Sequence, residues 1–150
     1  MCLLVYIASD QPLPLIPWKT DAPGFHVREL GDLGEDEVKM RQHFSKPFVY
    51  YIGSHEKCGC GFRYGQMPLE FEDDDDRKED AAARESVLHL REYLSKVVEN
   101  GQVELYACWP EEQTLEPTSH ATIIPLDIGS NDTEFTFKER ELLTILKPKS

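Results

Sequence analysis

A glycine-rich stretch in the first half of the chain contains residues that can bind a metal or react as thiols. His55, Cys58 and Cys60 lie within six residues of one another, and a glycine flanks Cys60 on each side. Thiolate sulfur and imidazole nitrogen are ligands that Zn²⁺ takes in tetrahedral protein sites. Glycine also gives a loop conformational freedom, so residues 53–68 can fold tightly enough to gather these side chains. The stretch therefore predicts a Cys/His thiol site in this loop.

In the first interpretation the site binds zinc, and His55, Cys58 and Cys60 supply three of the ligands. The fourth is a water molecule, a carboxylate or one of three further side chains: Cys2, Cys108 or His26. The Cys-x-Cys spacing is less specific for zinc than the Cys-x2-Cys spacing of zinc knuckles. If the strands next to Cys2 and Cys108 run parallel, these two cysteines lie at opposite ends of the sheet. At most one of them then reaches the loop.

Two other interpretations use the same thiols without a metal. Cys58 and Cys60 are a candidate redox pair, because a disulfide across one intervening residue is strained and easily reduced. Alternatively, Cys60 is a nucleophile with the amides of its flanking glycines as oxyanion donors and His55 or His120 as the base. A structural role for two packed thiols in a glycine-rich turn stays open beside these interpretations. Whether the protein is an enzyme is therefore left open.

The segment that follows the loop is strongly acidic. Residues 70–80 hold eight acids and two bases and carry a charge of −6, half of the −12 of the whole chain. Four consecutive aspartates form its centre: Asp73, Asp74, Asp75 and Asp76. They lack the alternating ligands and central glycine of a calcium loop, so they favour a solvated helix N-terminus or a docking patch for a basic protein. In the docking interpretation the protein is an inhibitor-type or immunity-type interaction module with structural cysteines.

Apolar periodicity predicts the helices that position these residues. Apolar side chains recur every three or four residues along a long amphipathic helix at about 76–100, which ends at Asn100-Gly101. Asp76 and Glu79 have the spacing of a capping box at its start. A short helix is expected at about 35–44 from the spacing of its apolar residues.

Alternating or continuous apolar runs predict the strands. They are expected at residues 3–8, 25–30, 47–52, 103–109, 134–137 and 142–146. The run at 3–8 is apolar throughout, which is typical of a strand buried on both faces. The order of elements predicts a single α+β domain over residues 1–150 with a mixed sheet, in which residues 48–109 form one crossover unit.

Composition and charge exclude several classes of partner. The chain has 28 acidic and 16 basic side chains, a balance that disfavours binding to nucleic acid and to anionic membranes. It contains no apolar run long enough to span a bilayer, and its apolar opening lacks the basic residues that begin a secretory signal. We therefore expect a soluble cytoplasmic protein whose four cysteines are reduced.

Three stretches of the chain carry a resemblance to other proteins. They are the opening MCLLVYIASDQPLP, the central YIGSHEKCGCGF and the later VELYACW. Together they resemble a group of uncharacterised short bacterial proteins with the motif His-Glu-x-Cys-Gly-Cys-Gly-Phe. The resemblance implies a bacterial, cytosolic, stand-alone domain, and it carries over no activity, cofactor or residue role.

Overall fold

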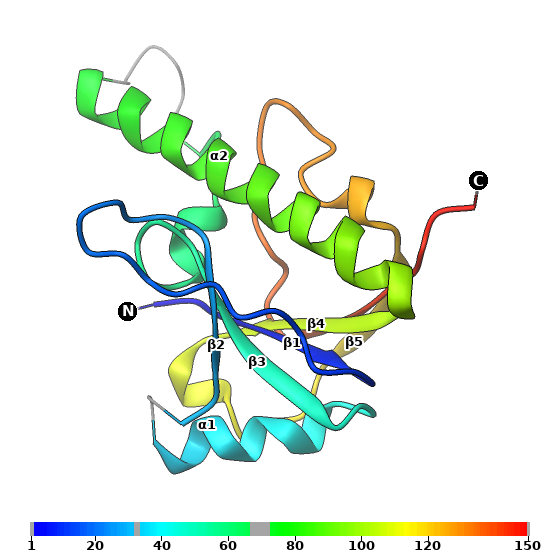
Figure 1. Ribbon diagram of the computed structural model, residues 1–150. Coiled ribbons are helices and arrows are strands. Elements are labelled where there is room, and N and C mark those ends of the chain that lie inside the picture. Colours follow the sequence, from blue (N-terminus) through cyan, green and yellow to red (C-terminus); the bar gives the residue numbers. More distant parts are fainter. Residues whose placement is uncertain (1, 32–33, 67–72, 150) are drawn as a thin grey trace.

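The computed structural model of the protein describes residues 2–31, 34–66 and 73–149. A six-stranded sheet lies at its centre, with the long helix α2 (Asp74–Val97) across one face and the short helix α1 (Glu35–Lys39) below the other (Figure 1). The strands are β1 (Leu4–Ser9), β2 (His26–Glu29), β3 (Phe48–Gly53), β4 (Val103–Cys108), β5 (Ser119–Ile123) and β6 (Glu141–Ile145). Their spatial order is β2-β3-β1-β4-β6-β5.

The sheet is mixed, as the sequence predicts. β1 pairs antiparallel with both β3 and β4, whereas β5 pairs parallel with β6. Since β3 and β4 are both antiparallel to β1, they are parallel to each other, and α2 connects them. The predicted crossover unit is therefore present, with β1 inserted between its two strands. All six residues of β1 are buried, which agrees with the expectation of a central strand covered on both faces.

The two predicted helices are confirmed with small shifts of their ends. α2 starts before residue 76 because Asp73 and Asp76 form the capping box, in place of the Asp76 and Glu79 pair expected from the spacing. It continues into a 3-10 turn at Val98–Asn100. α1 likewise continues into a 3-10 turn at Met40–His43, so together they span the predicted segment 35–44. Among the described residues, no helix has both the length and the apolarity that a membrane span requires.

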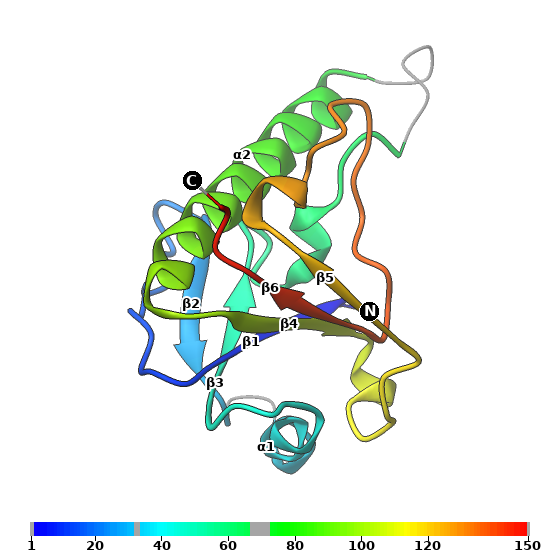
Figure 2. The same ribbon diagram turned by 90° about the vertical axis from the view of Figure 1, so that its right-hand side faces the viewer.

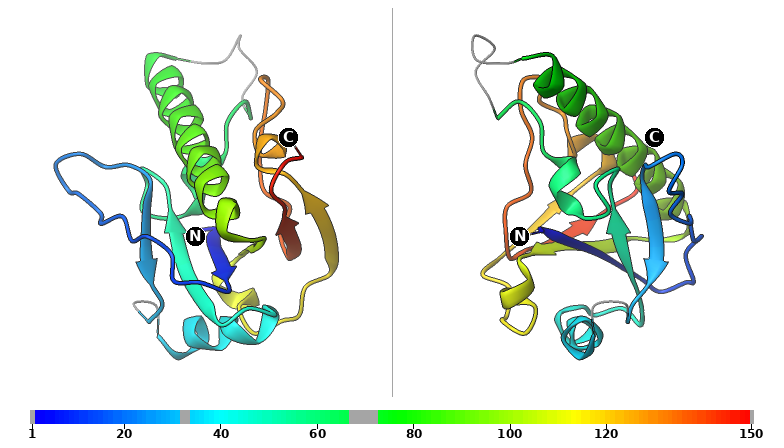
Figure 3. Two further views of the ribbon diagram at one scale, coloured as in Figure 1. Left: turned by 45° about the vertical axis from the view of Figure 1, so that its right-hand side comes forward. Right: turned by 90° about the vertical axis from the view of Figure 1, so that its left-hand side faces the viewer.

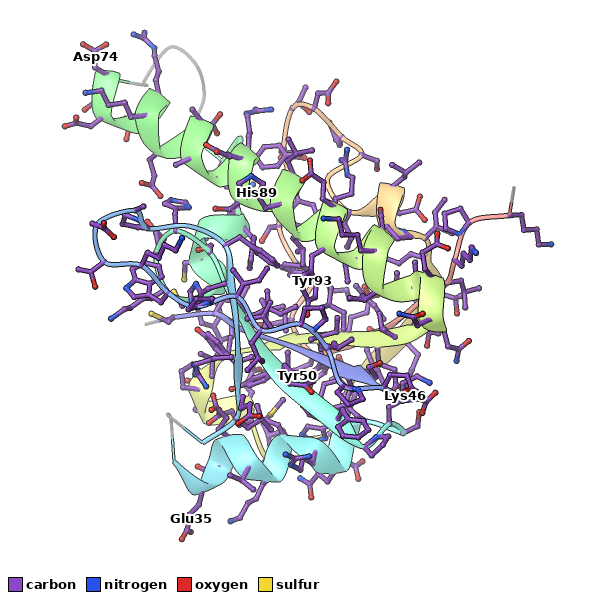
Figure 4. All side chains as sticks on the ribbon, in the orientation of Figure 1. Glu35, Lys46, Tyr50, Asp74, His89 and Tyr93 are labelled. Carbon is purple, nitrogen blue, oxygen red and sulfur yellow. The ribbon has the colours of Figure 1, made fainter. Side chains whose placement is uncertain are left out.

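The two faces of the sheet carry different cores, and Figures 2 and 3 show from several sides the helices that lie over these faces. The apolar stripe of α2 packs on one face, where Tyr93 of the helix and Tyr50 of β3 both lie between helix and sheet (Figure 4). The α1 face holds a smaller cluster that includes Tyr6, Tyr51 and Tyr106. A fully buried carboxylate, that of Glu37 in α1, accepts hydrogen bonds on this second face. Only the α2 face is a conventional apolar core.

The C-terminal strands differ from the prediction. Residues 134–137 form no strand; Phe135 makes one isolated bridge with Tyr64, while its ring packs against the apolar core. The strand β5 lies instead at Ser119–Ile123, where the sequence predicts no strand. β5 is an edge strand whose residues alternate between partly buried and exposed, so its pattern lacks the strong apolar residues of a central strand. The aromatic residues at 135 and 137 fill space in the core without joining the ladder.

Candidate functional site

The loop after β3 folds back on itself in a tight turn. Ser54 donates its backbone N–H to the carbonyl of Cys58 at 3.1 Å, and Lys57 donates its N–H to the carbonyl of Ser54 at 3.0 Å. The Ser54 hydroxyl donates to the same Cys58 carbonyl. Lys57 closes the turn with a φ of 73°, a conformation that is uncommon for a residue with a side chain. The turn directs Cys58 back toward the sheet.

Glycines in this loop provide room for close contacts more than unusual dihedral angles. Gly53, Gly59 and Gly61 have ordinary φ values, whereas Lys57 and Gly65 have left-handed ones. A Cβ at Gly59 would lie 2.8 Å from the carbonyl oxygen of Leu3, and one at Gly53 would lie 2.1 Å from the His26 ring. The loop can therefore lie against Leu3 at Gly59, and β3 can end against the His26 ring at Gly53, only because these positions lack side chains.

Two backbone contacts attach the loop to the residue before β1. Gly59 donates its N–H to the Leu3 carbonyl at 2.6 Å, and Leu3 donates its own N–H to the sulfur of Cys60 at 3.2 Å. These contacts place Cys2 beside the loop. The Sγ atoms of Cys2, Cys58 and Cys60 all lie within 4.8 Å of one another, and we call this group the thiol cluster.

The three thiols of the cluster differ in exposure. Cys2 is exposed, Cys60 is half-buried, and Cys58 is 5 % exposed. Burial and the hydrogen bond with Cys2 raise the pKa of the Cys58 thiol well above its usual value. No disulfide joins the four cysteines, all of which belong to the described part of the chain. Without a metal, Cys58 therefore stays protonated at neutral pH, and a thiophilic metal would have to displace its proton.

His55 lies in a different cluster from the cysteines. Its Nε2 is 2.7 Å from a carboxylate oxygen of Glu79, and its Nδ1 is 2.9 Å from the hydroxyl of Ser86. Glu56 approaches the same carboxylate. The donor atoms of His55, Glu56 and Glu79 lie within 4.8 Å of one another, and we call them the His–Glu cluster. The structure thus brings Cys58 and Cys60 together as the sequence predicts, and it pairs them with Cys2 while His55 faces α2.

A cavity of about 490 Å³ opens beside the thiol cluster. Cys2 and Cys58 form part of its wall, and the rest comes from Leu4, Trp18, His26, Arg28, Tyr51, Glu56 and Lys57. The Lys57 ammonium lies 5.4 Å from the centre of the Trp18 ring. Arg28 stacks on the Tyr51 ring and also forms a two-pronged ion pair with Glu37. In a chain of net charge −12, this cavity places a lysine and an arginine beside two thiols.

The fourth cysteine and the other candidate histidines, His26 and His120, are not donors in the thiol cluster. The strands next to Cys2 and Cys108, β1 and β4, are antiparallel, so the condition of parallel strands is not met. Cys108 pairs opposite Leu4, at the same end of the sheet as Cys2. Cys108 is nevertheless outside the thiol cluster; it is buried on the α1 face, and burial raises its pKa to about 12. His120 is on β5, which β4 and β6 separate from β1. His26 uses Nδ1 to contact the carbonyl of Gly24 at 3.0 Å.

The aspartate run begins α2. Asp73 and Asp76 cap the helix through reciprocal side-chain to backbone hydrogen bonds, and Asp74 forms an exposed ion pair with Arg77. Asp74 stands at the end of α2 that projects beyond the sheet (Figure 4). Residues 70–72 of the acidic segment and 67–68 of the glycine-rich loop lie outside the described residues. Capping accounts for two of the four aspartates, and docking of a basic partner to the run stays a prediction.

Glu56 and Glu79 are the candidate donors that sequence reasoning missed. Glu56 adjoins His55 in the motif, and Glu79 lies two turns before Ser86 on the same face of α2, so both had a local signal. Searches of protein-family models, curated proteins and solved structures find no match to this chain. The geometry of the two clusters therefore carries the functional argument.

Proposed function

We propose that this protein binds zinc through the thiolates of Cys2, Cys58 and Cys60. The observation that carries the proposal is the convergence of three sulfur atoms within 4.8 Å. A zinc ion about 2.3 Å from each sulfur would hold the sulfurs about 3.8 Å apart in a tetrahedral site. The required movement is small, and three soft thiolates favour zinc over the hard cations Mg²⁺ and Ca²⁺.

In this donor set Cys2 takes the place of His55, which the sequence predicts as a ligand beside Cys58 and Cys60. The imidazole of His55 would have to leave both Glu79 and Ser86 to join the cysteines, whereas Cys2 is already beside them. The N–H of Leu3 also points at the sulfur of Cys60. Backbone donors to sulfur stabilise thiolate ligands, so this contact suits Cys60 as a ligand.

The cavity beside the cluster supports a site with an open fourth position. Three protein ligands and one exchangeable ligand are the arrangement of catalytic zinc, whereas structural zinc has four protein ligands. Lys57 supplies a positive charge in the cavity, and Trp18 supplies a flat apolar wall. We therefore assign the fourth position to water or to the anionic group of a small molecule in the cavity.

Thiol redox chemistry is a second candidate, and the contact between an exposed and a buried thiol favours it. A peroxide would oxidise the exposed Cys2 thiolate to a sulfenic acid, with release of water or an alcohol. The thiol of Cys58 would then attack that sulfur, form a disulfide and release a second water molecule. This candidate uses the same cysteines and needs no metal.

Native mass spectrometry on protein purified without chelator tests both candidates, together with a count of reactive thiols. One zinc per chain with fewer than four reactive thiols supports the zinc site, and Cys58→Ser should then lose the metal. Cys108→Ser is the matched control, because this cysteine is buried outside the thiol cluster. An apo mass with four reactive thiols, unchanged after added Zn²⁺, would overturn the zinc proposal. Loss of two hydrogens after peroxide treatment would then support the redox candidate.

A further inference from the structure

The His–Glu cluster gathers donors of a different chemical type from the thiols. His55 and Glu56 come from the loop, and Glu79 comes from the second turn of α2. One imidazole nitrogen and two carboxylate oxygens suit Mn²⁺, Fe²⁺ and Zn²⁺, and they lack the thiolates that favour softer ions. The donor atoms are near enough to share one ion without a change in the backbone.

The imidazole of His55 is held in the orientation that a metal ligand needs. Its Nδ1 contacts the hydroxyl of Ser86, a residue that is 2 % exposed on the packed face of α2. Metal-binding histidines almost always have such a partner on the nitrogen away from the metal. When a cation is bound, the Ser86 hydroxyl can accept the proton of Nδ1, and the lone pair of Nε2 then binds the cation in place of its contact with Glu79.

The charges of the cluster also fit a divalent cation. Carboxylate oxygens of Glu56 and Glu79 lie within 4.8 Å of each other, and His55 contacts the carboxylate of Glu79. Two carboxylates in contact repel each other unless a proton or a cation lies between them. A bound M²⁺ would take the place of that proton and balance both carboxylates.

We infer that His55, Glu56 and Glu79 form a second metal site, which binds a divalent transition metal and joins the loop to α2. The inference does not depend on the zinc proposal, because the two donor sets share no residue. Glu56 nevertheless lines the cavity beside the thiols, so the two sites would lie on either side of one short turn.

Mn²⁺ is the appropriate probe because carboxylates and imidazole bind it and thiolates bind it poorly. Free Mn²⁺ is measured by electron paramagnetic resonance as the full chain is titrated. We expect one site per chain, weakened about tenfold or more by Glu79→Gln and by His55→Asn. Glu85→Gln is the matched control, since it removes the same charge from an exposed position on α2 outside the cluster.

Paramagnetic broadening in NMR spectra locates the ion. Mn²⁺ should broaden the signals of His55 first, and the Cys58→Ser variant should bind Mn²⁺ as the parent does. Equal affinity in Glu79→Gln and Glu85→Gln would overturn the inference. Broadening centred on Asp74–Asp76 would also overturn it, because the ion would then be held by the acidic helix end alone. Loss of Mn²⁺ binding in Cys58→Ser would place the ion at the thiols and would equally overturn it.

Discussion

The loop after β3 contributes donors to two clusters that differ in chemistry and in the element that holds them. The thiol cluster joins Cys58 and Cys60 to Cys2, and the backbone of Leu3 attaches it to the start of the central strand β1. The His–Glu cluster joins the same loop to α2 through Glu79, whose side chain is 54 % exposed. A soft site is anchored to the sheet, and a harder site is anchored to an exposed turn of a helix.

This difference teaches that the turn at Ser54–Cys58 separates two chemistries that are adjacent in the sequence. Donors before the left-handed Lys57 face α2, and the cysteines after it face β1. Disturbing the thiol cluster should therefore affect the metal and the core together. Disturbing the His–Glu cluster should affect its own ligand and leave the fold nearly unchanged.

The largest expected effect is the loss of zinc affinity in Cys2→Ser, with His55→Asn as the variant for comparison. Cys2→Ser removes a proposed direct ligand and should weaken zinc binding by more than about 100-fold, the upper range for outer-shell partners. His55→Asn should leave zinc binding within about twofold of the parent, because the imidazole contacts Ser86 and Glu79 of α2 and lies outside the thiol cluster. Competition with a chromophoric chelator measures both affinities. The reverse order would return His55 to the zinc donor set and remove Cys2 from it.

A smaller effect is expected from Gly59→Ala, which adds a methyl group where the loop meets β1. Its Cβ would lie 2.8 Å from the Leu3 carbonyl, so the loop must move and the protein should lose about 1–3 kcal/mol of unfolding free energy. Zinc affinity should fall as Cys58 and Cys60 move away from Cys2. Urea denaturation with and without zinc measures both effects.

Gly24→Ala is the control for this change. Its added Cβ would lie 3.9 Å from the nearest atom, at ordinary van der Waals distance. We expect parent-like stability and zinc affinity for Gly24→Ala. If Gly59→Ala also keeps the stability and zinc affinity of the parent, the contact between the loop and Leu3 does not position the thiol cluster.

Glu79→Gln should have a still smaller effect on the fold when no metal is present. The contact between Glu79 and His55 is partly exposed, and such contacts contribute less than about 1 kcal/mol. Thermal unfolding in a chelating buffer tests this expectation against Glu85→Gln. A loss of several kcal/mol would show that the His–Glu cluster is as structural as the thiol cluster, which would remove the contrast between the two.

The smallest effect is expected when Asp74 and Asp75 are both changed to Asn. Both residues lie in the first turn of α2, before Glu79, and neither is one of the capping residues Asp73 and Asp76. The unfolding free energy should therefore stay within about 0.5 kcal/mol of the parent. Mn²⁺ and zinc affinities should also be unchanged. A large loss of Mn²⁺ affinity would assign the ion to the acidic run. If a basic protein binds the parent and not this variant, the docking interpretation is supported instead.

Much of the fold could be predicted because its signals are local. The apolar spacing of α2 and the continuous apolar run of β1 identify which residues are buried, and the structure agrees for Ala83, Val87, Leu90, Leu94 and Val97. β5 was missed because an edge strand needs little apolar surface, and its alternation is too weak to stand out from a polar loop. The prediction of a strand at 134–137 is wrong because aromatic residues are frequent in strands but also pack into a core from a loop, as Phe135 does.

The sequence by itself determined the donor types, the tight glycine-rich loop and the two neighbouring cysteines Cys58 and Cys60. Only the tertiary structure decided which donors meet. Leu3 and Cys60 are 57 residues apart, and they touch because β1 lies between β3 and β4 and so receives the loop that leaves β3. His55 faces α2 because that helix packs on the sheet with the buried Ser86 and the exposed Glu79 next to the turn. Residue chemistry is a local property, whereas the meeting of donors depends on strand order and helix packing, which no short motif encodes.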